Sequence, residues 1–187
     1  MGTGTIVLIV IAVIVVLILL YVAGTYNKLV HLRNLVKDQW AQIDVLLKRR
    51  ADLIPNLVET VKGYASHEKE TLDAVITARN KAVSATTPED EMKANGELTG
   101  ALNRLFALTE SYPDLKANTN FLDLQNNLKE TEDKISYARQ FYNDAVLKYK
   151  NKLEMFPSNI VAGLFHFKPE AFFEATEADK EVPKVQF

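Results

Sequence analysis

The hydrophobic pattern of the chain begins with an unbroken apolar segment, Ile6–Ala23, which reads IVLIVIAVIVVLILLYVA. As a helix rising about 1.5 Å per residue, it would span roughly 27 Å, close to the ~30 Å hydrocarbon core of a bilayer. Since a helix satisfies its own backbone polar groups inside lipid, the segment predicts a membrane-spanning helix. The predicted membrane anchor includes Ile6, Leu8, Ile11, Val15, Leu19 and Tyr21.

A cleaved signal peptide is the alternative interpretation, because Val22-Ala23-Gly24 resembles a cleavage site. However, Met1–Thr5 carries no basic side chain, and the apolar segment is longer than the roughly 7–15 residues of a signal peptide. We therefore favour an uncleaved anchor.

Basic residues follow the apolar segment and none precedes it. Lys28, Arg33 and Lys37 lie within the next fifteen or so positions, where the positive-inside rule counts charge. The rule predicts a single-pass protein of the bacterial inner membrane, with its N-terminus outside and its remaining domain in the cytoplasm.

The rest of the chain shows the three-and-four spacing of apolar residues that is typical of amphipathic helices. We expect helices over residues 28–50, 52–85, 88–110 and 121–156. The start at Asp52 rests on its capping ability and on Pro55 in the first turn, and the start at Pro88 on Thr87 as N-cap. The break before the last helix contains Pro113.

Long helices with short connections favour an antiparallel up-down bundle. The predicted fold is therefore all-α, with an N-terminal transmembrane helix that continues into a bundle of about four long helices. We divide the chain into a short N-terminal tail at 1–5, an anchor at 6–24, a bundle at 25–156, and a Phe-rich strap with a charged tail at 157–187.

The up-down topology predicts that the Phe-rich segment returns towards the bilayer. This segment is too short and too interrupted by Pro to span a membrane. It either covers the open end of the bundle core or contacts the membrane interface or a membrane-embedded partner. The candidate interfacial residues are Phe156, Leu164, Phe165 and Phe167.

Composition narrows the possible chemistry. The net charge of −2 and the absence of a basic excess give no reason to expect a nucleic-acid partner. The chain has no Cys, which excludes disulfides, thiolate metal sites and a Cys nucleophile. His67-Glu68 resembles the start of a metalloprotease helix, but Thr71 stands where a second His would be needed. We therefore expect no metal, no cofactor and no catalytic residues.

Several polar residues lie on or beside the apolar stripes. Buried charges must be paired to be tolerated, so these residues predict interhelical ion pairs and hydrogen bonds that fix the register of the bundle. A carboxylate-lined site inside the bundle is the alternative. The candidate network comprises Asp44, Arg50, Asn56, Glu68, Arg79, Glu132, Arg139 and Asn143.

The chain resembles the LemA family over about residues 5–173. The matching stretches are YNKLV at 26–30, KRRADLIPNLV at 48–58, YPDLKAN at 112–118 and EDKI at 132–135. The resemblance implies a membrane anchor and an antiparallel helical bundle in the cytoplasm, and it brings no catalytic residues or cofactor. Members of the family look like membrane-associated helical proteins, some of them connected with envelope stress, organelle membranes or a neighbouring membrane metalloprotease.

Two functional hypotheses follow. The first is a non-enzymatic interaction scaffold or adaptor, whose partners are the lipid bilayer and an unidentified membrane or cytoplasmic protein. The second is a membrane-shaping or envelope-stress-sensing protein that works by self-assembly, as a homo-oligomer, and by lipid contact.

Overall fold

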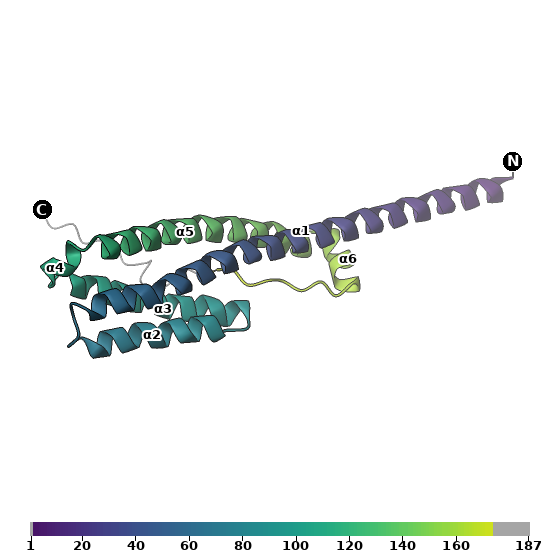
Figure 1. Cartoon of the computed structure of the whole chain (residues 1–187). Coiled ribbons are helices and arrows are strands. Elements are labelled where there is room, and N and C mark those ends of the chain that lie inside the picture. Colours follow the sequence, from purple (N-terminus) through teal and green to yellow (C-terminus); the bar gives the residue numbers. More distant parts are fainter. Residues whose placement is uncertain (1, 174–187) are drawn as a thin grey trace, which may run out of the picture. The chain divides into compact units, whose positions relative to one another are not determined.

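The computed structural model describes residues 2–173, and their regular structure is entirely helical (Figure 1). This confirms the predicted all-α fold with four long helices. In chain order the helices are α1 (Thr3–Lys62), α2 (Lys69–Ser84), α3 (Pro88–Thr109), α4 (Pro113–Lys116), α5 (Thr119–Glu154) and α6 (Ser158–Leu164).

The predicted break at Asp52 is wrong, because α1 continues through Pro55 to Lys62. A proline inside a helix lacks the N–H that would bond to the carbonyl four residues earlier. Here that carbonyl belongs to Ala51, and it accepts a hydrogen bond from Nε of Arg79 on α2 at 3.2 Å. Arg79 thus supplies the donor that Pro55 removes, and the actual break follows at Gly63.

The described chain forms two compact units. Unit 1 contains the residues up to Trp40 together with Phe141–Phe172, and unit 2 contains Ala41–Gln140 together with Phe173. The helices α1 and α5 each contribute to both units, so the bundle expected at 25–156 is divided between them.

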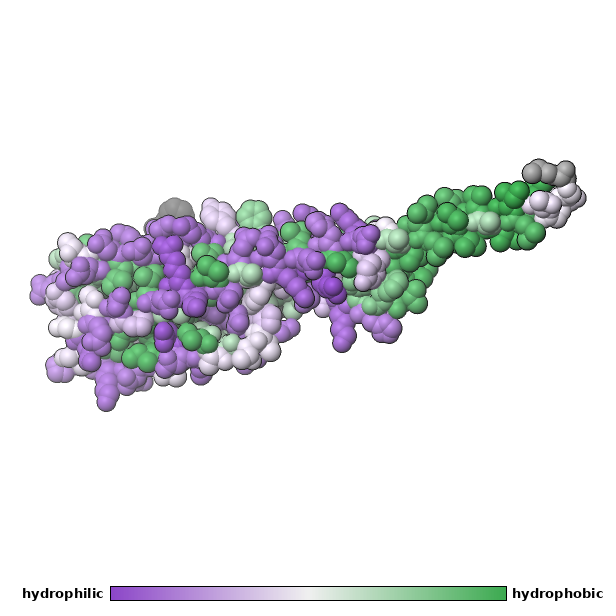
Figure 2. All heavy atoms as spheres, turned by 45° about the vertical axis from the view of Figure 1, so that its right-hand side comes forward, coloured by the Kyte–Doolittle hydropathy of each residue, from purple (hydrophilic) through white to green (hydrophobic). Residues whose placement is uncertain are grey.

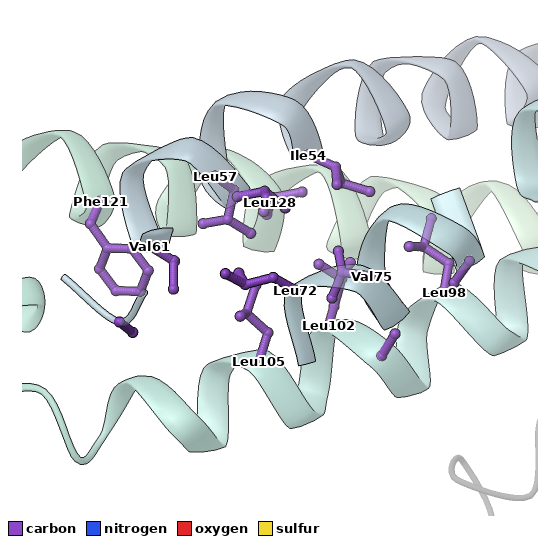
Figure 3. Packing of buried hydrophobic residues seen from close by; sticks show 14 of the residues in the cluster. Ile54, Leu57, Val61, Leu72, Val75, Leu98, Leu102, Leu105, Phe121 and Leu128 are labelled. Carbon is purple, nitrogen blue, oxygen red and sulfur yellow. The ribbon is translucent and has the colours of Figure 1, made fainter. Parts of the chain in front are cut away.

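Unit 2 is built around a continuous apolar core. Its buried residues come from α1, α2, α3, α4 and α5, and Figure 3 shows them pointing towards one another. Thr87 caps α3 through a hydrogen bond from the backbone N–H of Asp90, with Pro88 in the first turn as predicted. The labelled core residues are Ile54, Leu57, Val61, Leu72, Val75, Leu98, Leu102, Leu105, Phe121 and Leu128.

Unit 1 has a second, smaller set of buried residues. The stripe predicted after the apolar segment supplies Leu29, Leu32 and Val36, and the Trp40 ring meets the Tyr142 ring edge to face at 5.4 Å. The residues after α6 remain against this unit, since the Tyr142 hydroxyl donates to the carbonyl of Ala171 at 2.9 Å. Further buried residues are Ala145, Val146, Tyr149, Ser158, Val161 and Ala162.

A buried arginine joins three helices of unit 2. Arg50 on α1 is fully buried, and its Nη1 donates to Oε2 of Glu132 on α5 at 2.7 Å and to Oγ1 of Thr99 on α3 at 3.1 Å. Its Nη2 donates to Oδ1 and to the backbone carbonyl of Asn95 on α3, at 2.6 and 3.1 Å. Such a set of acceptors compensates the cost of removing a guanidinium from water.

We expect Arg50→Leu to lower the free energy of unfolding by about 3 kcal/mol, the lower end of the range for breaking a buried ion pair, because the half-exposed Glu132 can be hydrated. Urea unfolding of the full-length protein in detergent, followed by far-UV circular dichroism, measures this change. The matched control is Arg49→Leu, since Arg49 is 43% exposed and lies 3.9 Å from Glu130. We expect this control to shift stability by less than about 1 kcal/mol, as for other surface pairs. Equal effects of the two substitutions would contradict a structural role for Arg50.

Candidate membrane-contact and docking surfaces

The apolar segment at the start of α1 is uncovered. Each predicted anchor residue is exposed, from 41% at Tyr21 to 69% at Leu8, and Figure 2 shows the continuous hydrophobic surface they form. This part of α1 is long and apolar enough to cross a membrane by its length and composition. Side chains of this kind are stable in contact with lipid and costly in contact with water.

A second apolar surface lies on α6 and the turn before it. Ile160 and Leu164 lie one helical turn apart and are 62% and 65% exposed, whereas Val161 and Ala162 on the other side of the helix are buried. Phe156, just before α6, is 79% exposed. The short helix therefore has one face against unit 1 and one apolar face that the described chain leaves uncovered.

Aromatic rings connect the end of α6 to α1. The Tyr26 ring lies 4.8 Å from the ring of Phe165 and 5.6 Å from that of Phe167, in both cases edge to face. The guanidinium of Arg33 stands over the Phe167 ring at 5.4 Å. Phe165 and Phe167, predicted as interfacial residues, thus pack on α1, while Phe156 and Leu164 point away from the protein.

The third surface is a groove between α3 and α5, with a volume of about 520 Å³. Leu102, Phe106 and Leu128 form its apolar floor, and the exposed side chains of Asn103 and Asn126 stand on its two rims. Its lining residues recur over two turns of each helix, and Arg50 and Glu132 lie at one end. This geometry suits a short segment of another polypeptide, with apolar contacts below and polar contacts at the edges.

The other residues of the predicted polar network do not form one cluster, although Asp44 and Arg79 line the same cavity. Oε1 of Glu68 accepts a hydrogen bond from the Tyr112 hydroxyl at 2.8 Å, which raises the pKa of that phenol. The guanidinium of Arg139 lies over the Phe173 ring at 4.2 Å. Asn56 is exposed on α1, and Asn143 is half-buried on α5. The structure joins Arg50 to Glu132 but does not bring all eight residues into one site.

Asp44 faces a cavity of about 310 Å³ in unit 2, together with Glu91. Burial raises the pKa of the Glu91 carboxyl, and the negative charge of Asp44 raises it further. Within residues 2–173, no group of three or more His, Asp or Glu side chains is placed to hold a metal ion.

Sequence reasoning missed Asn95 and Thr99, the α3 partners of Arg50. Both residues sit inside an amphipathic helix where a polar side chain is usually solvated, and only the burial of Arg50 makes them acceptors. Sequence reasoning also did not include Tyr26 among the predicted interfacial residues. The signal for Tyr26 was its position three residues beyond the apolar segment, where tyrosine favours the membrane interface.

Comparison with known proteins identifies one matching family and several similar proteins. The model of the LemA family matches residues 39–187. Protein LemA of Metamycoplasma hominis is 29% identical over 161 residues, which cover 84% of this chain and 72% of that protein. Magnetosome protein MamQ 2 of Paramagnetospirillum magneticum is 26% identical, and MamQ of Magnetospirillum gryphiswaldense 23% identical, each over 82% of this chain and 66% of the relative.

The matched residues include the core of unit 2, the Arg50 cluster and α6, so the similarity extends over the elements that define the fold. A family match of this extent, on a helical chain that begins with a membrane-spanning candidate, indicates a membrane-associated protein. The chain belongs to the LemA family.

Proposed function

We propose that this protein is a non-enzymatic, membrane-anchored scaffold or adaptor that binds a segment of another membrane protein in the groove between α3 and α5. The anchor holds the protein in the bilayer, and the groove supplies the binding surface. In this proposal the protein's task is to hold a partner at the membrane, at the inner membrane of a bacterium.

The groove is the observation that carries the proposal. Its floor is formed by Leu102 and Leu128, which are almost wholly buried, and by the half-buried Phe106, and concave surfaces with an apolar lining are the usual docking sites for amphipathic segments. The polar rims and the half-exposed Glu132 at one end provide hydrogen-bonding groups that select the orientation of a bound segment.

Membrane shaping through self-assembly is the second candidate. The exposed apolar face of α6 favours it, because a protein that acts on lipid needs a surface that enters the interface. The same groove would then receive a second copy of this chain, an outcome that the following experiment separates from partner binding.

We expect a photo-cross-linking amino acid at Asn103, in the full-length chain in native membranes, to form an adduct with a different membrane protein. Asn126→Arg on the opposite rim should reduce the adduct strongly, because the longer charged side chain fills the groove. The matched control is Asn127→Arg, which changes the neighbouring exposed asparagine outside the groove. A cross-linker at Lys93, exposed on the same helix α3 but not in the groove, reports background.

An adduct that Asn126→Arg leaves unchanged, or no adduct at all, would contradict binding in the groove. An adduct with the mass of two chains, lost in Asn126→Arg, would replace the scaffold by the self-assembling alternative.

The basic residues after the apolar segment lead us to propose that the helical units lie in the cytoplasm. Ser84, exposed at the end of α2, is a suitable place for one cysteine in a chain that has none. With Ser84→Cys, we expect a membrane-impermeant maleimide to label the protein only after lysis. Labelling in intact cells, or after the outer membrane alone is opened, would reverse the orientation.

A further inference from the structure

We propose that α6 and the turn before it form a second membrane contact, in which Phe156, Ile160 and Leu164 enter the interfacial layer of an anionic bilayer. This contact is separate from the apolar segment of α1 and does not depend on the α3–α5 groove. Its ligand is a lipid surface.

The two-faced character of α6 is the first argument. Ser158, Val161 and Ala162 are buried and hold the helix against unit 1. Ile160 and Leu164 lie on the opposite face and keep well over half of their surface exposed. A helix fixed to the protein on one face and apolar on the other is the form that interfacial helices take.

The position of α6 identifies lipid as the occupant. Phe165 directly follows α6, and its ring contacts the ring of Tyr26 on α1. Figure 1 shows α6 beside α1. Tyr26 comes three residues after the apolar segment ends at Ala23, a rise of about 4.5 Å along the helix. If the apolar segment spans the bilayer, Tyr26 lies at headgroup level, where tyrosine side chains gather, and α6 lies beside it. The short helix α6 therefore lies next to the end of the membrane surface of α1.

Charge supplies an independent argument for anionic lipid. The residues of unit 1 include seven Lys and Arg against four Asp and Glu, whereas residues 41–140 contain thirteen against sixteen. The positive excess thus belongs to the unit that contains both the apolar segment and α6. Lys150 and Arg33 stack on the Phe172 and Phe167 rings of the same unit. Basic residues next to an apolar surface are attracted to anionic headgroups.

The contacts divide the aromatic residues of this region into two groups. Phe167 is half-buried between Tyr26 and Arg33 and positions the chain after α6, so its replacement tests packing. Phe156, Ile160 and Leu164 have no such covering and are the residues whose replacement tests lipid contact.

The full-length chain, with Ile160→Cys or Leu164→Cys as its one cysteine, can carry an environment-sensitive nitrobenzoxadiazole label. It is reconstituted in vesicles of phosphatidylcholine and phosphatidylglycerol, with or without lipids that bear a quenching doxyl group. Asn159→Cys is the matched control, because Asn159 is an exposed polar residue on the same helix. We expect blue-shifted emission and strong quenching by the doxyl lipids at positions 160 and 164, and weaker quenching at 159.

Water-like emission at positions 160 and 164 that doxyl lipids do not quench would overturn the proposal. Blue-shifted emission without lipid quenching would also overturn it, because the face would then be covered by protein. Far-UV circular dichroism of each labelled variant verifies that the helices are intact. A further variant, Ile160→Ser with Leu164→Ser, should abolish the lipid quenching of a label at Phe156→Cys if the three residues enter the membrane together.

Discussion

The absence of water from a bilayer is the constraint on which the structure depends. Backbone polar groups in lipid must bond to one another, so the apolar segment has to be helical despite its many β-branched residues. The sequence that follows has no Gly-Pro pair and no Pro-rich stretch that would end the helix, and α1 extends to Lys62. One element therefore carries both the candidate membrane-spanning segment and part of the core of unit 2.

Inside unit 2 the corresponding constraint is that buried polar groups need partners. The carbonyl freed by Pro55 is satisfied by Arg79, and the two Nη atoms of Arg50 donate to acceptors on α3 and α5. Both solutions join α1 to later helices, through Arg79 to the next helix, α2, and through Arg50 to α3 and α5. The polar interactions of this bundle thus fix which residues of neighbouring helices lie opposite one another, which apolar packing alone leaves less certain.

The sequence was sufficient for the features that depend on local physics. Apolar periodicity predicted an all-helical chain and the extents of α3 and α5 closely, and Thr87 with Pro88 predicted the start of α3. The sequence was insufficient where a residue from another helix changes the conformation that the local sequence favours. Pro55 alone favours a helix start, whereas in the structure the helix continues and Arg79 donates to the carbonyl that Pro55 leaves free. Likewise, Phe156 and Phe167 are alike in the sequence, and only the packing of α6 distinguishes the exposed ring from the half-buried one.

The two membrane surfaces of unit 1 differ greatly in strength. Full burial of an Ile or Leu side chain is worth about 1.5–3 kcal/mol, so the outer face of α6 offers only a few kcal/mol and could not anchor a protein by itself. The outer face of α6 does not need to anchor the protein, because α1 already holds α6 at the membrane. Contact of α6 with lipid therefore costs little additional entropy, as in an intramolecular association. A weak contact is then sufficient to fix how unit 1 faces the lipid. Because it is weak, it would respond to lipid composition, which the apolar segment of α1 would not.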